Sequence, residues 1–425
     1  MSRVLLSLAV IMRDSAGEIL ACLESAAEAA DEMVIVDTGS KDASVKIVRK
    51  FLRKWQEGAP GRRGKLHYFQ WQDDFALAKN YALARCHGEY VLFLDSDESL
   101  SAGTRGNLRP LLVQLARGEW PAGLKMVQVP GEPQAEAGDF DVLELWRENV
   151  DLEGHPVAAA PEDLAVRLLR RQELLRYRGE VHEQLVLADG RPAKVAVADR
   201  ELLTIRHTGY RPGVREAKHK RNQAILLREE QQGGSTFLLD YYLAEAHLAR
   251  KEWAAAIECA KRCQETTLPL HDRIAPCRII YQALREMEKE ACRRAGLQVA
   301  EGELLPEPQE GESRSLQAAR IIRRQGEQLL AQGLAAFPDY PDFYYFRGGR
   351  RWNGGDKEGG RKDLLQALAL AETFPQNHPE ADFRFKPLIP ELLAALVQVC
   401  REMGDEQEAV FFQKKLADQA LAPQA

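Results

Sequence analysis

The stretch Glu89-Tyr-Val-Leu-Phe-Leu-Asp-Ser-Asp-Glu98 decides the fold. Its apolar run, residues 90–94, predicts a strand covered on both faces, as strands are inside a parallel sheet. The run ends directly in Asp95 and Asp97. In open sheets of this kind, ligands bind outside the carboxyl ends of the strands. Two carboxylates at such an end offer hard oxygen ligands to Mg²⁺ or Mn²⁺ and leave coordination positions for phosphate oxygens.

Short apolar runs alternate with helical patterns in the first hundred residues, which indicates βαβ units and a mainly parallel sheet. We expect strands at residues 4–12, 33–36, 66–69 and 89–94, and helices at about 16–30, 45–55 and 75–86, with one more that ends at about 117. Ser15 and Glu18 predict a capping box at the start of the first helix. More antiparallel strands are expected at 125–129, 142–146, 165–169 and 202–206, so the sheet is predicted to be mixed.

Helical periodicity replaces the strand pattern from about Lys218 onward. The sequence therefore predicts an α/β domain over 1–220 and an all-α domain over 221–425, with an exposed loop at about 296–315. Small residues recur twelve positions apart, as Ala244 and Ala256 and as Gly348 and Gly360. This spacing resembles tetratricopeptide-like repeats, and a generic helical bundle is the alternative. Five aromatic residues belong either to a groove or to the core: Tyr241, Tyr242, Phe343, Tyr344 and Tyr345.

Composition excludes several classes of protein. The 425 residues are 45% hydrophobic, with 58 Lys and Arg against 64 Asp and Glu, and the net charge of -6 gives no reason to expect nucleic acid. Seven cysteines without a CxxC pair indicate neither a disulfide scaffold nor a zinc site. The longest apolar run, 4–12, has nine residues, whereas a membrane span needs roughly 20. Arg13 and Asp14 end this run before a cleavage site, so we expect a cytoplasmic protein.

Three polar segments follow the predicted parallel strands at their carboxyl ends, at residues 12–14, 37–40 and 95–97. We expect them to converge at one edge of the sheet. Alone, an Asp-x-Asp motif is weak evidence for a metal, because aspartate pairs are common in surface loops. Its place after a buried strand, at the same edge as Asp37, favours the metal site.

These residues resemble the family 2 inverting glycosyltransferases of GT-A fold. The likeness rests on Val10-Ile-Met-Arg-Asp14, Val34-Ile-Val-Asp-Thr-Gly-Ser-Lys-Asp42, Trp71-Gln-Asp-Asp-Phe-Ala-Leu-Ala-Lys-Asn80 and Leu92-Phe-Leu-Asp-Ser-Asp-Glu98. Tyr177-Arg-Gly-Glu-Val-His-Glu183 and Ile205-Arg-His-Thr-Gly-Tyr210 extend it. Together with the C-terminal repeats, the chain is similar to the subgroup that includes bacterial peptide S-glycosyltransferases. It departs from the family at 12–15, where Met-Arg-Asp-Ser replaces the usual Lys-Asn-Glu.

The resemblance implies a Rossmann-like mixed sheet that binds a nucleoside-diphosphate-sugar, with a UDP-sugar favoured. Asp37 would contact the base or ribose, and a turn-forming role is its alternative. Asp97 would bind Mg²⁺ or Mn²⁺, whose charge offsets the departing diphosphate. Asp95 would contact the ribose or the metal, and Ser96 and Arg13 would belong to the donor site.

Two residues of the predicted helix 75–86, Lys79 and Asn80, are further candidates for donor binding. Their alternative is an exposed helix face. The preceding Asp73 and Asp74 suit a helix N-terminus.

Inverting transfer needs a general base that takes the acceptor proton. Glu183 is the leading candidate, followed by Glu180 and Asp141. His182 and His207 are candidates for the metal site or for phosphate contact, and a structural histidine is the alternative for each.

Basic residues cluster after His207. Arg206, Lys218 and Arg221, together with Arg211, are candidates for diphosphate binding, and a solvated domain junction is the alternative. Lys218 and Arg221 fall on one helix face. A second arginine group, which includes Arg167, is expected to be spread over both faces of the strands.

The sequence thus predicts a metal-dependent glycosyltransferase of the hexosyltransferase type that transfers a sugar with inversion. Its acceptor could be a peptide or protein side chain held by the repeats, which could also form a homo-dimer. The alternative is a catalytically inactive scaffold whose repeats bind a protein partner. A nucleotidyltransferase is disfavoured, because no loop rich in glycine and lysine follows the first strand.

Overall fold

The computed structural model divides into two compact units, residues 1–234 and 235–425. The residues that it describes are 4–127, 136–151, 154–155, 157, 163–171, 175–189, 191, 193–209, 214–231, 237–263, 270–299, 303–309, 311–377 and 389–421. The contact division places helix α5 (Val214–Gln231) with the first unit. The domain boundary predicted near residue 220 lies inside this helix.

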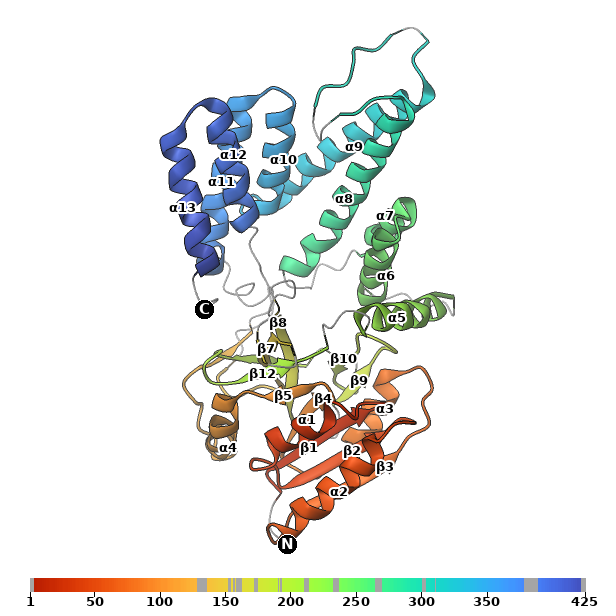
Figure 1. Cartoon of the computed structure of the whole chain (residues 1–425), viewed down its shortest axis with the longest axis vertical. Coiled ribbons are helices and arrows are strands. Elements are labelled where there is room, and N and C mark those ends of the chain that lie inside the picture. Colours follow the sequence, from red (N-terminus) through yellow and green to blue (C-terminus); the bar gives the residue numbers. More distant parts are fainter. Residues whose placement is uncertain are drawn as a thin grey trace. The chain divides into compact units, whose positions relative to one another are not determined.

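The first unit alternates strands and helices and then becomes richer in strands (Figure 1). Its described elements are β1 (Leu6–Met12), α1 (Ile19–Ala26), β2 (Glu32–Asp37), α2 (Ser44–Glu57), β3 (Arg63–Tyr68), α3 (Phe75–Leu83), β4 (Tyr90–Asp95), β5 (Glu98–Leu100), α4 (Ala102–Ala116), β6 (Leu124–Met126), β7 (Val142–Asn149), β8 (Asp163–Arg170), β9 (Arg176–Arg178), β10 (Gln184–Val186), β11 (Val195–Ala198), β12 (Thr204–His207) and α5.

The main sheet is mixed, as the sequence predicts. Its strand order is β3-β2-β1-β4-β8-β7-β11-β6, and β12 pairs with both β5 and β7. The four strands of the βαβ region are parallel, whereas β8 runs antiparallel to β4 and to β7. Strand β12 is parallel to β7 and antiparallel to β5. The sheet therefore joins the end of β12 to the segment that follows β4.

All seven residues of β1 are buried, because helices cover both faces of the sheet. Leu8 and Val10 pack with α1, α2 and α4 on one face. Ala9 and Ile11 pack with α3 on the other. This double coverage explains why the parallel strands read as continuous apolar runs.

The start of α1 differs from the prediction. The helix begins at Ile19, and the Glu18 side chain makes no capping hydrogen bond. Ser15 Oγ instead lies 2.8 Å from Ser96 Oγ and donates to Arg13 O over 3.1 Å. The predicted capping box is therefore wrong, because a contact with the distant β4–β5 segment takes the hydroxyl.

The second unit consists of helices that pack in consecutive pairs, α6 with α7, α8 with α9, α10 with α11 and α12 with α13. Their bounds are α6 (Phe237–Ala249), α7 (Trp253–Arg262), α8 (Leu270–Arg294), α9 (Arg314–Ala336), α10 (Pro341–Asn353), α11 (Lys357–Asn377), α12 (Ile389–Met403) and α13 (Glu406–Leu421). The residues between α8 and α9 that the structure describes form no helix and are mostly exposed, as predicted.

Small residues lie where paired helices approach each other. A Cβ atom on Gly348 would lie 3.1 Å from Gly360 O, and Ala244 and Ala256 are fully buried. The predicted tetratricopeptide-like organisation is confirmed. Among the aromatic residues, Phe343 is buried in the core, whereas Tyr345 lines a hollow beside Trp352.

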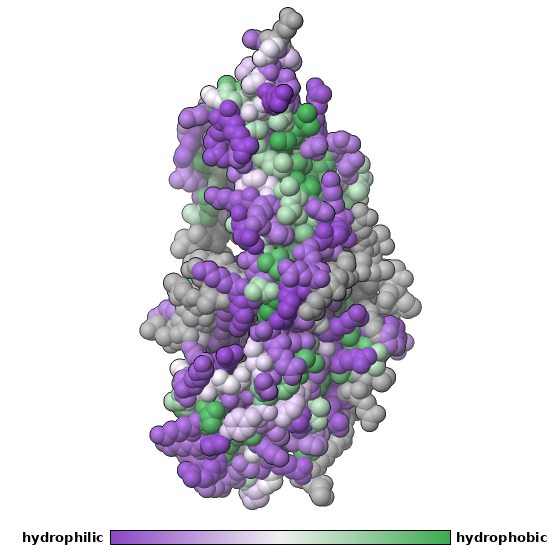
Figure 2. Space-filling model, turned by 90° about the vertical axis from the view of Figure 1, so that its right-hand side faces the viewer, coloured by the Kyte–Doolittle hydropathy of each residue, from purple (hydrophilic) through white to green (hydrophobic). Residues whose placement is uncertain are grey.

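Along the described parts of the chain, no helix is both long and apolar enough to cross a membrane. Hydrophilic residues prevail on the face of the molecule in Figure 2, and the hydrophobic ones form scattered spots.

Candidate active site

Strand pairing brings the predicted carboxylates to one edge of the sheet. Met12 of β1 lies opposite Asp37 of β2, and the neighbouring Ile11 lies opposite Asp95 of β4. The ends of these three strands are therefore level, as the sequence predicts.

Asp37 is buried and engaged with its own turn. Its carboxylate accepts hydrogen bonds from Gly39 N at 3.3 Å and from Ser40 N at 3.1 Å. This is the turn-forming role that the sequence left open. A carboxylate has about four lone-pair sites, so these contacts leave acceptor capacity for a ligand.

Asp97 lies between two basic side chains. Its Oδ2 accepts from Lys218 Nζ at 2.7 Å and faces His207 Nε2 at 3.5 Å. Burial favours protonation of Asp97, but His207 and Lys218 outweigh it and hold the pKa of this carboxyl below its usual range. Gly209 borders the pair: a Cβ atom there would lie 2.7 Å from Asp97 Oδ2 and closer still to His207 Nε2. Only glycine fits at this position without a shift of its neighbours.

Strand β12 places His207 beside Asp97. The register sets His207 opposite Asn149 of β7 and Glu98 of β5. His207 Nδ1 lies 2.8 Å from Asn149 Oδ1, and since an amide oxygen only accepts, Nδ1 is the donor. Thr208 N donates to Asp97 O over 3.0 Å, which joins the residue after β12 to the segment between β4 and β5.

Asp95 is tied into the protein by cations. Arg167 Nη2 donates to its Oδ2 over 2.7 Å, and Lys79 Nζ lies 3.8 Å from its Oδ1. Burial raises the pKa of Asp95, but Arg167 and Lys79 outweigh it and lower the pKa to about 2. Arg167 also donates two hydrogen bonds to the Glu98 carboxylate, from Nε over 2.6 Å and from Nη2 over 2.8 Å. Sequence reasoning named Arg167 only within an arginine group spread over the strands and did not place it in the site; its position on β8, which pairs with β4, brings it there.

Lys79 forms a close ion pair with Glu183, the leading candidate for the base. The ammonium lies 5.3 Å from the ring centroid of Phe93 and 5.2 Å from that of Tyr177. The Lys79 side chain is only 8% exposed, so the exposed helix face proposed as its alternative is wrong. Burial lowers the pKa of Lys79, but Glu183 and Asp95 together raise it above its ordinary value.

Asn80 holds the backbone of strand β9. Its Nδ2 donates to Tyr177 O, and its Oδ1 accepts from Tyr177 N, both over 2.8 Å. Its amide thus supports the segment that leads to Glu183. Before the helix, Asp74 accepts from Leu77 N at 2.8 Å and caps α3.

The other candidates for the base have partners of their own. Glu180 accepts from Arg228 Nη2 at 2.7 Å, and this arginine also bonds Asp73. Asp141 is buried and accepts from Lys194 N at 2.8 Å. Of the three carboxylates, Glu183 is the one that lies next to Lys79 and hence to Asp95.

Two further cations stand near the carboxylates. The guanidinium of Arg221 lies 4.8 Å from the ring centroid of Phe75. Its pKa is lowered by burial and then by the charge of Arg13, although Asp97 and Asp95 oppose this. Two neighbouring guanidiniums provide a positive field suited to an anion. Arg211 lies outside the described residues.

Arg206 is placed differently from His207. Consecutive strand residues point to opposite faces, and Arg206 is exposed while His207 is buried. Its Nε lies 3.7 Å from Glu148 Oε2. Arg206 is therefore engaged on the other side of β12.

The residues described here do not group three His, Cys, Asp or Glu side chains around one metal position. His182 has a left-handed backbone conformation, with φ 54°. Asp97 and His207 do fit a cation: a carboxylate oxygen and an imidazole nitrogen, both common metal ligands, lie 3.5 Å apart, and Lys218 already directs positive charge to that oxygen.

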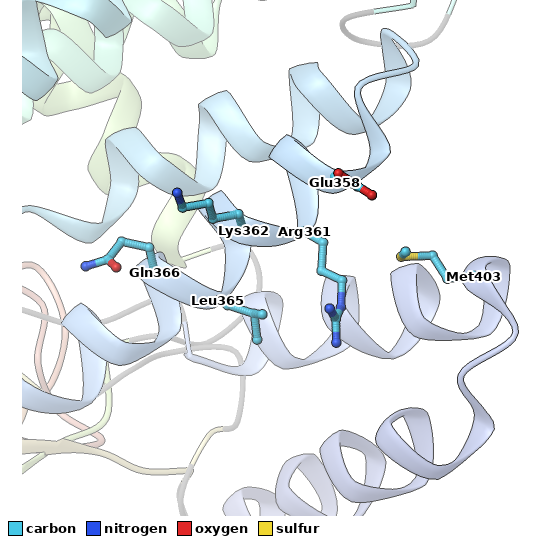
Figure 3. A pocket seen from close by; sticks show the side chains of 6 residues that line it. All are labelled: Glu358, Arg361, Lys362, Leu365, Gln366 and Met403. Carbon is cyan, nitrogen blue, oxygen red and sulfur yellow. The ribbon is translucent and has the colours of Figure 1, made fainter.

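A hollow of about 560 Å³ lies in the helical unit (Figure 3). It is lined by Glu358, Arg361, Lys362, Leu365, Gln366 and Met403. This lining has one carboxylate and no histidine, cysteine or serine, so it lacks the pairs of groups that acid–base or nucleophilic chemistry requires.

Comparison with known proteins links the first unit to a family. A TPR repeat-containing protein of Synechococcus elongatus is 33% identical over 147 residues, which are 34% of this chain and 32% of that protein. An uncharacterized glycosyltransferase of Haemophilus influenzae is 31% identical over 83 residues, which are 20% of this chain and 30% of that protein. The chain thus spans about a third of the length of the curated relatives it matches.

Among solved structures, the mannosyltransferase PcManGT from Pyrobaculum calidifontis in complex with GDP-Man and Mn²⁺ is 16% identical. The likeness covers 88% of this chain and 87% of that one with a TM-score of 0.38. Residues 7–112, which contain strands β1 to β4 and the Asp95-Ser-Asp97 segment, match the family described as Glycosyl transferase family 2. This segment, about a quarter of the chain, is therefore similar to glycosyl transferase family 2.

Proposed function

We propose that this protein is a metal-dependent glycosyltransferase that transfers a sugar from a nucleoside-diphosphate-sugar to an acceptor with inversion. The observation that carries the proposal is the arrangement around Asp97, whose carboxylate faces His207 and Lys218 at the edge of a sheet within the family 2 segment. A UDP-sugar is the favoured donor, and Asp37 is the residue proposed for its base or ribose.

Asp97 and His207 are the residues proposed to hold Mg²⁺ or Mn²⁺. The bound ion would offset the negative charge that gathers on the departing diphosphate. Lys218 is the proposed protein cation beside this charge, because its ammonium already contacts Asp97 Oδ2 at 2.7 Å. Arg13 and Arg221 extend the positive field, since each sits near the other's charge.

Glu183 is the proposed general base. Its carboxylate, 12% exposed, would take the proton from the acceptor heteroatom as that atom attacks the anomeric carbon. The bond from this carbon to the diphosphate oxygen breaks, and its electron pair leaves with the nucleoside diphosphate. Lys79 positions Glu183, because it joins this carboxylate to Asp95 across two aromatic rings.

The acceptor is proposed to be a peptide or protein side chain held by the helical unit. Arrays of paired helices commonly bind extended peptides. A hollow of about 220 Å³ beside Tyr345, Phe346 and Trp352 supports this proposal, because aromatic side chains supply much of the contact energy at protein interfaces. A homo-dimer through the same unit stays a prediction.

Thermal unfolding of the full chain with nucleoside diphosphates and their sugars, with and without Mn²⁺, tests the proposal. A donor at a hundred times its Kd stabilises the native state by about 2.7 kcal/mol. Asp97→Ala is expected to abolish this stabilisation and donor turnover. Asp139→Ala is the matched control, because that exposed carboxylate pairs with Lys194. If no donor stabilised the wild type, the inactive scaffold whose repeats bind a protein partner would replace this proposal.

The base has its own test. Glu183→Gln is expected to abolish transfer while donor stabilisation persists. Unchanged turnover in this variant would remove Glu183 from the mechanism and leave the donor site intact.

A further inference from the structure

Helix α2 presents an unusual row of positive charge on its outer side. Five exposed residues, here called the α2 basic face, follow the spacing i, i+3, i+4, i+7 and i+8: Lys46, Arg49, Lys50, Arg53 and Lys54. This spacing places them on one side of the helix. The other side, which includes Val48 and Leu52, packs into the core. The helix has one acidic residue, Glu57, at its last position.

The α2 basic face lacks the acidic partners that cations have elsewhere in the chain. In the parts of the chain that the structure describes, none of its residues forms a salt bridge; Arg49 donates to a tyrosine hydroxyl. By contrast, several cations of the helical unit are paired with carboxylates, for example Lys289 with Glu286 at 2.9 Å and Arg347 with Asp363 at 2.7 Å. The charge on α2 is therefore uncompensated within the described chain.

Folding does not favour this arrangement. Like charges three and four residues apart on a helix repel each other. Lys46 stands in the first turn, near the positive end of the helix dipole, where a cation is unfavourable. Only Lys54, in the last turn, suits the dipole. A local pattern that works against its own helix points to a role in binding.

We propose that the α2 basic face binds the anionic headgroups of a membrane surface. Rows of four to eight cations on a helix are attracted to anionic lipids. A convex helix side with long, flexible ammonium and guanidinium groups matches a broad planar surface. Proteins that bind single-stranded nucleic acids interleave cations with exposed aromatic rings. The aromatic residues of α2, Phe51 and Trp55, pack against the core instead, and among the five cations only Arg49 has a described contact with an exposed ring, that of Tyr68. Because the net charge of the chain is -6, attraction to an anionic surface has to come from a local basic region such as this face.

This inference does not depend on the proposed function, and vesicle sedimentation of the full chain tests it. The probes are vesicles of phosphatidylcholine alone and of phosphatidylcholine mixed with phosphatidylglycerol. Each cation near the surface contributes about a fivefold increase in binding, equivalent to about 1 kcal/mol. The variant Lys50→Gln/Arg53→Gln/Lys54→Gln is therefore expected to bind anionic vesicles roughly 100-fold more weakly than the wild type. Glutamine is chosen because it preserves helix propensity.

The matched control removes the same charge elsewhere, as Lys261→Gln/Arg324→Gln/Lys414→Gln on three exposed helix positions of the second unit. It should bind like the wild type, and 1 M salt, which shortens the screening length to about 3 Å, should release both. No binding to anionic vesicles, or equal binding to neutral ones, would overturn the proposal. Equal loss in the control would also overturn it, as would tighter binding to single-stranded RNA than to anionic vesicles.

Discussion

Replacement of Arg167 by methionine is expected to destabilise the first unit by about 3–5 kcal/mol, the usual cost of removing one partner from a buried ion pair. The Arg167 side chain is 11% exposed, and it donates two hydrogen bonds to Glu98, whose side chain is fully buried. After the substitution the nearest described cation to Glu98 is Arg147, at 3.6 Å. For a unit of this size each 1 kcal/mol shifts the unfolding midpoint by about 2–4 °C, so we expect a fall of roughly 6–20 °C.

The pH dependence of the stability of Arg167→Met distinguishes the loss of an ion pair from the loss of side-chain packing. In the wild type the pKa of Asp95 falls from 3.8 to about 2, because Arg167 and Lys79 outweigh burial. A depressed pKa contributes stability that is present above 3.8 and is lost as the pH falls through about 2. Without Arg167 the stabilisation from ionised Asp95 shrinks, because the first of the two cations that lower its pKa is gone. The deficit of the variant should therefore be largest at neutral pH and narrow as the pH drops below about 4.

Thermal unfolding followed by tryptophan fluorescence measures this deficit, since most of the tryptophans lie in the first unit: Trp55, Trp71, Trp120 and Trp146, against Trp253 and Trp352 in the second. Arg191→Met is the control, because the pair of Arg191 with Asp189 is exposed and such pairs contribute about 0–1 kcal/mol. A midpoint for Arg167→Met within about 2 °C of the wild type, or a deficit that does not change with pH, would refute the reasoning.

Two other substitutions probe the site directly. Gly209→Ala places a methyl group against Asp97 and His207. We expect it to lower the free energy of unfolding by about 1–3 kcal/mol through overpacking and to weaken the thermal stabilisation by donors and Mn²⁺. Unchanged stabilisation by these ligands would contradict the described contact. Lys79→Met removes the cation that pairs with Glu183, and donor turnover should fall by about 10²-fold or more. Lys79→Arg keeps the charge and should retain more of the turnover. Equal turnover in both variants would show that the ammonium has no part in positioning the base.

The parallel half of the sheet could be predicted because its signals are local. Apolar runs mark β1, β2 and β4, and the polar residues that follow each run lie at the same edge once the strands pair in parallel. The mixed character of the sheet and the close helix pairs of the second unit also follow from periodicity and spacing. Each of these inferences uses residues within a few turns or strand lengths of one another.

The partners of the site residues could not be predicted in the same way, because they depend on the register of distant strands. Arg167 meets Asp95 only because β8 pairs antiparallel with β4. His207 meets Asn149 only because β12 lies parallel to β7. The capping box failed for a related reason: Ser15 has the right local pattern, but a tertiary hydrogen bond takes its hydroxyl.

The sequence does not distinguish the two carboxylates of the Asp95-Ser-Asp97 segment, but the structure gives them different ion-pair partners. Asp95 is bound by Arg167, which is itself fixed by the buried Glu98, so a ligand that took this carboxylate would have to break a buried network. Asp97 is bound by Lys218, whose side chain is 38% exposed and able to withdraw into solvent at little cost. A divalent ion can replace that ammonium without leaving a buried charge unpaired. We therefore expect exchange of partners at Asp97 and a fixed structural charge at Asp95.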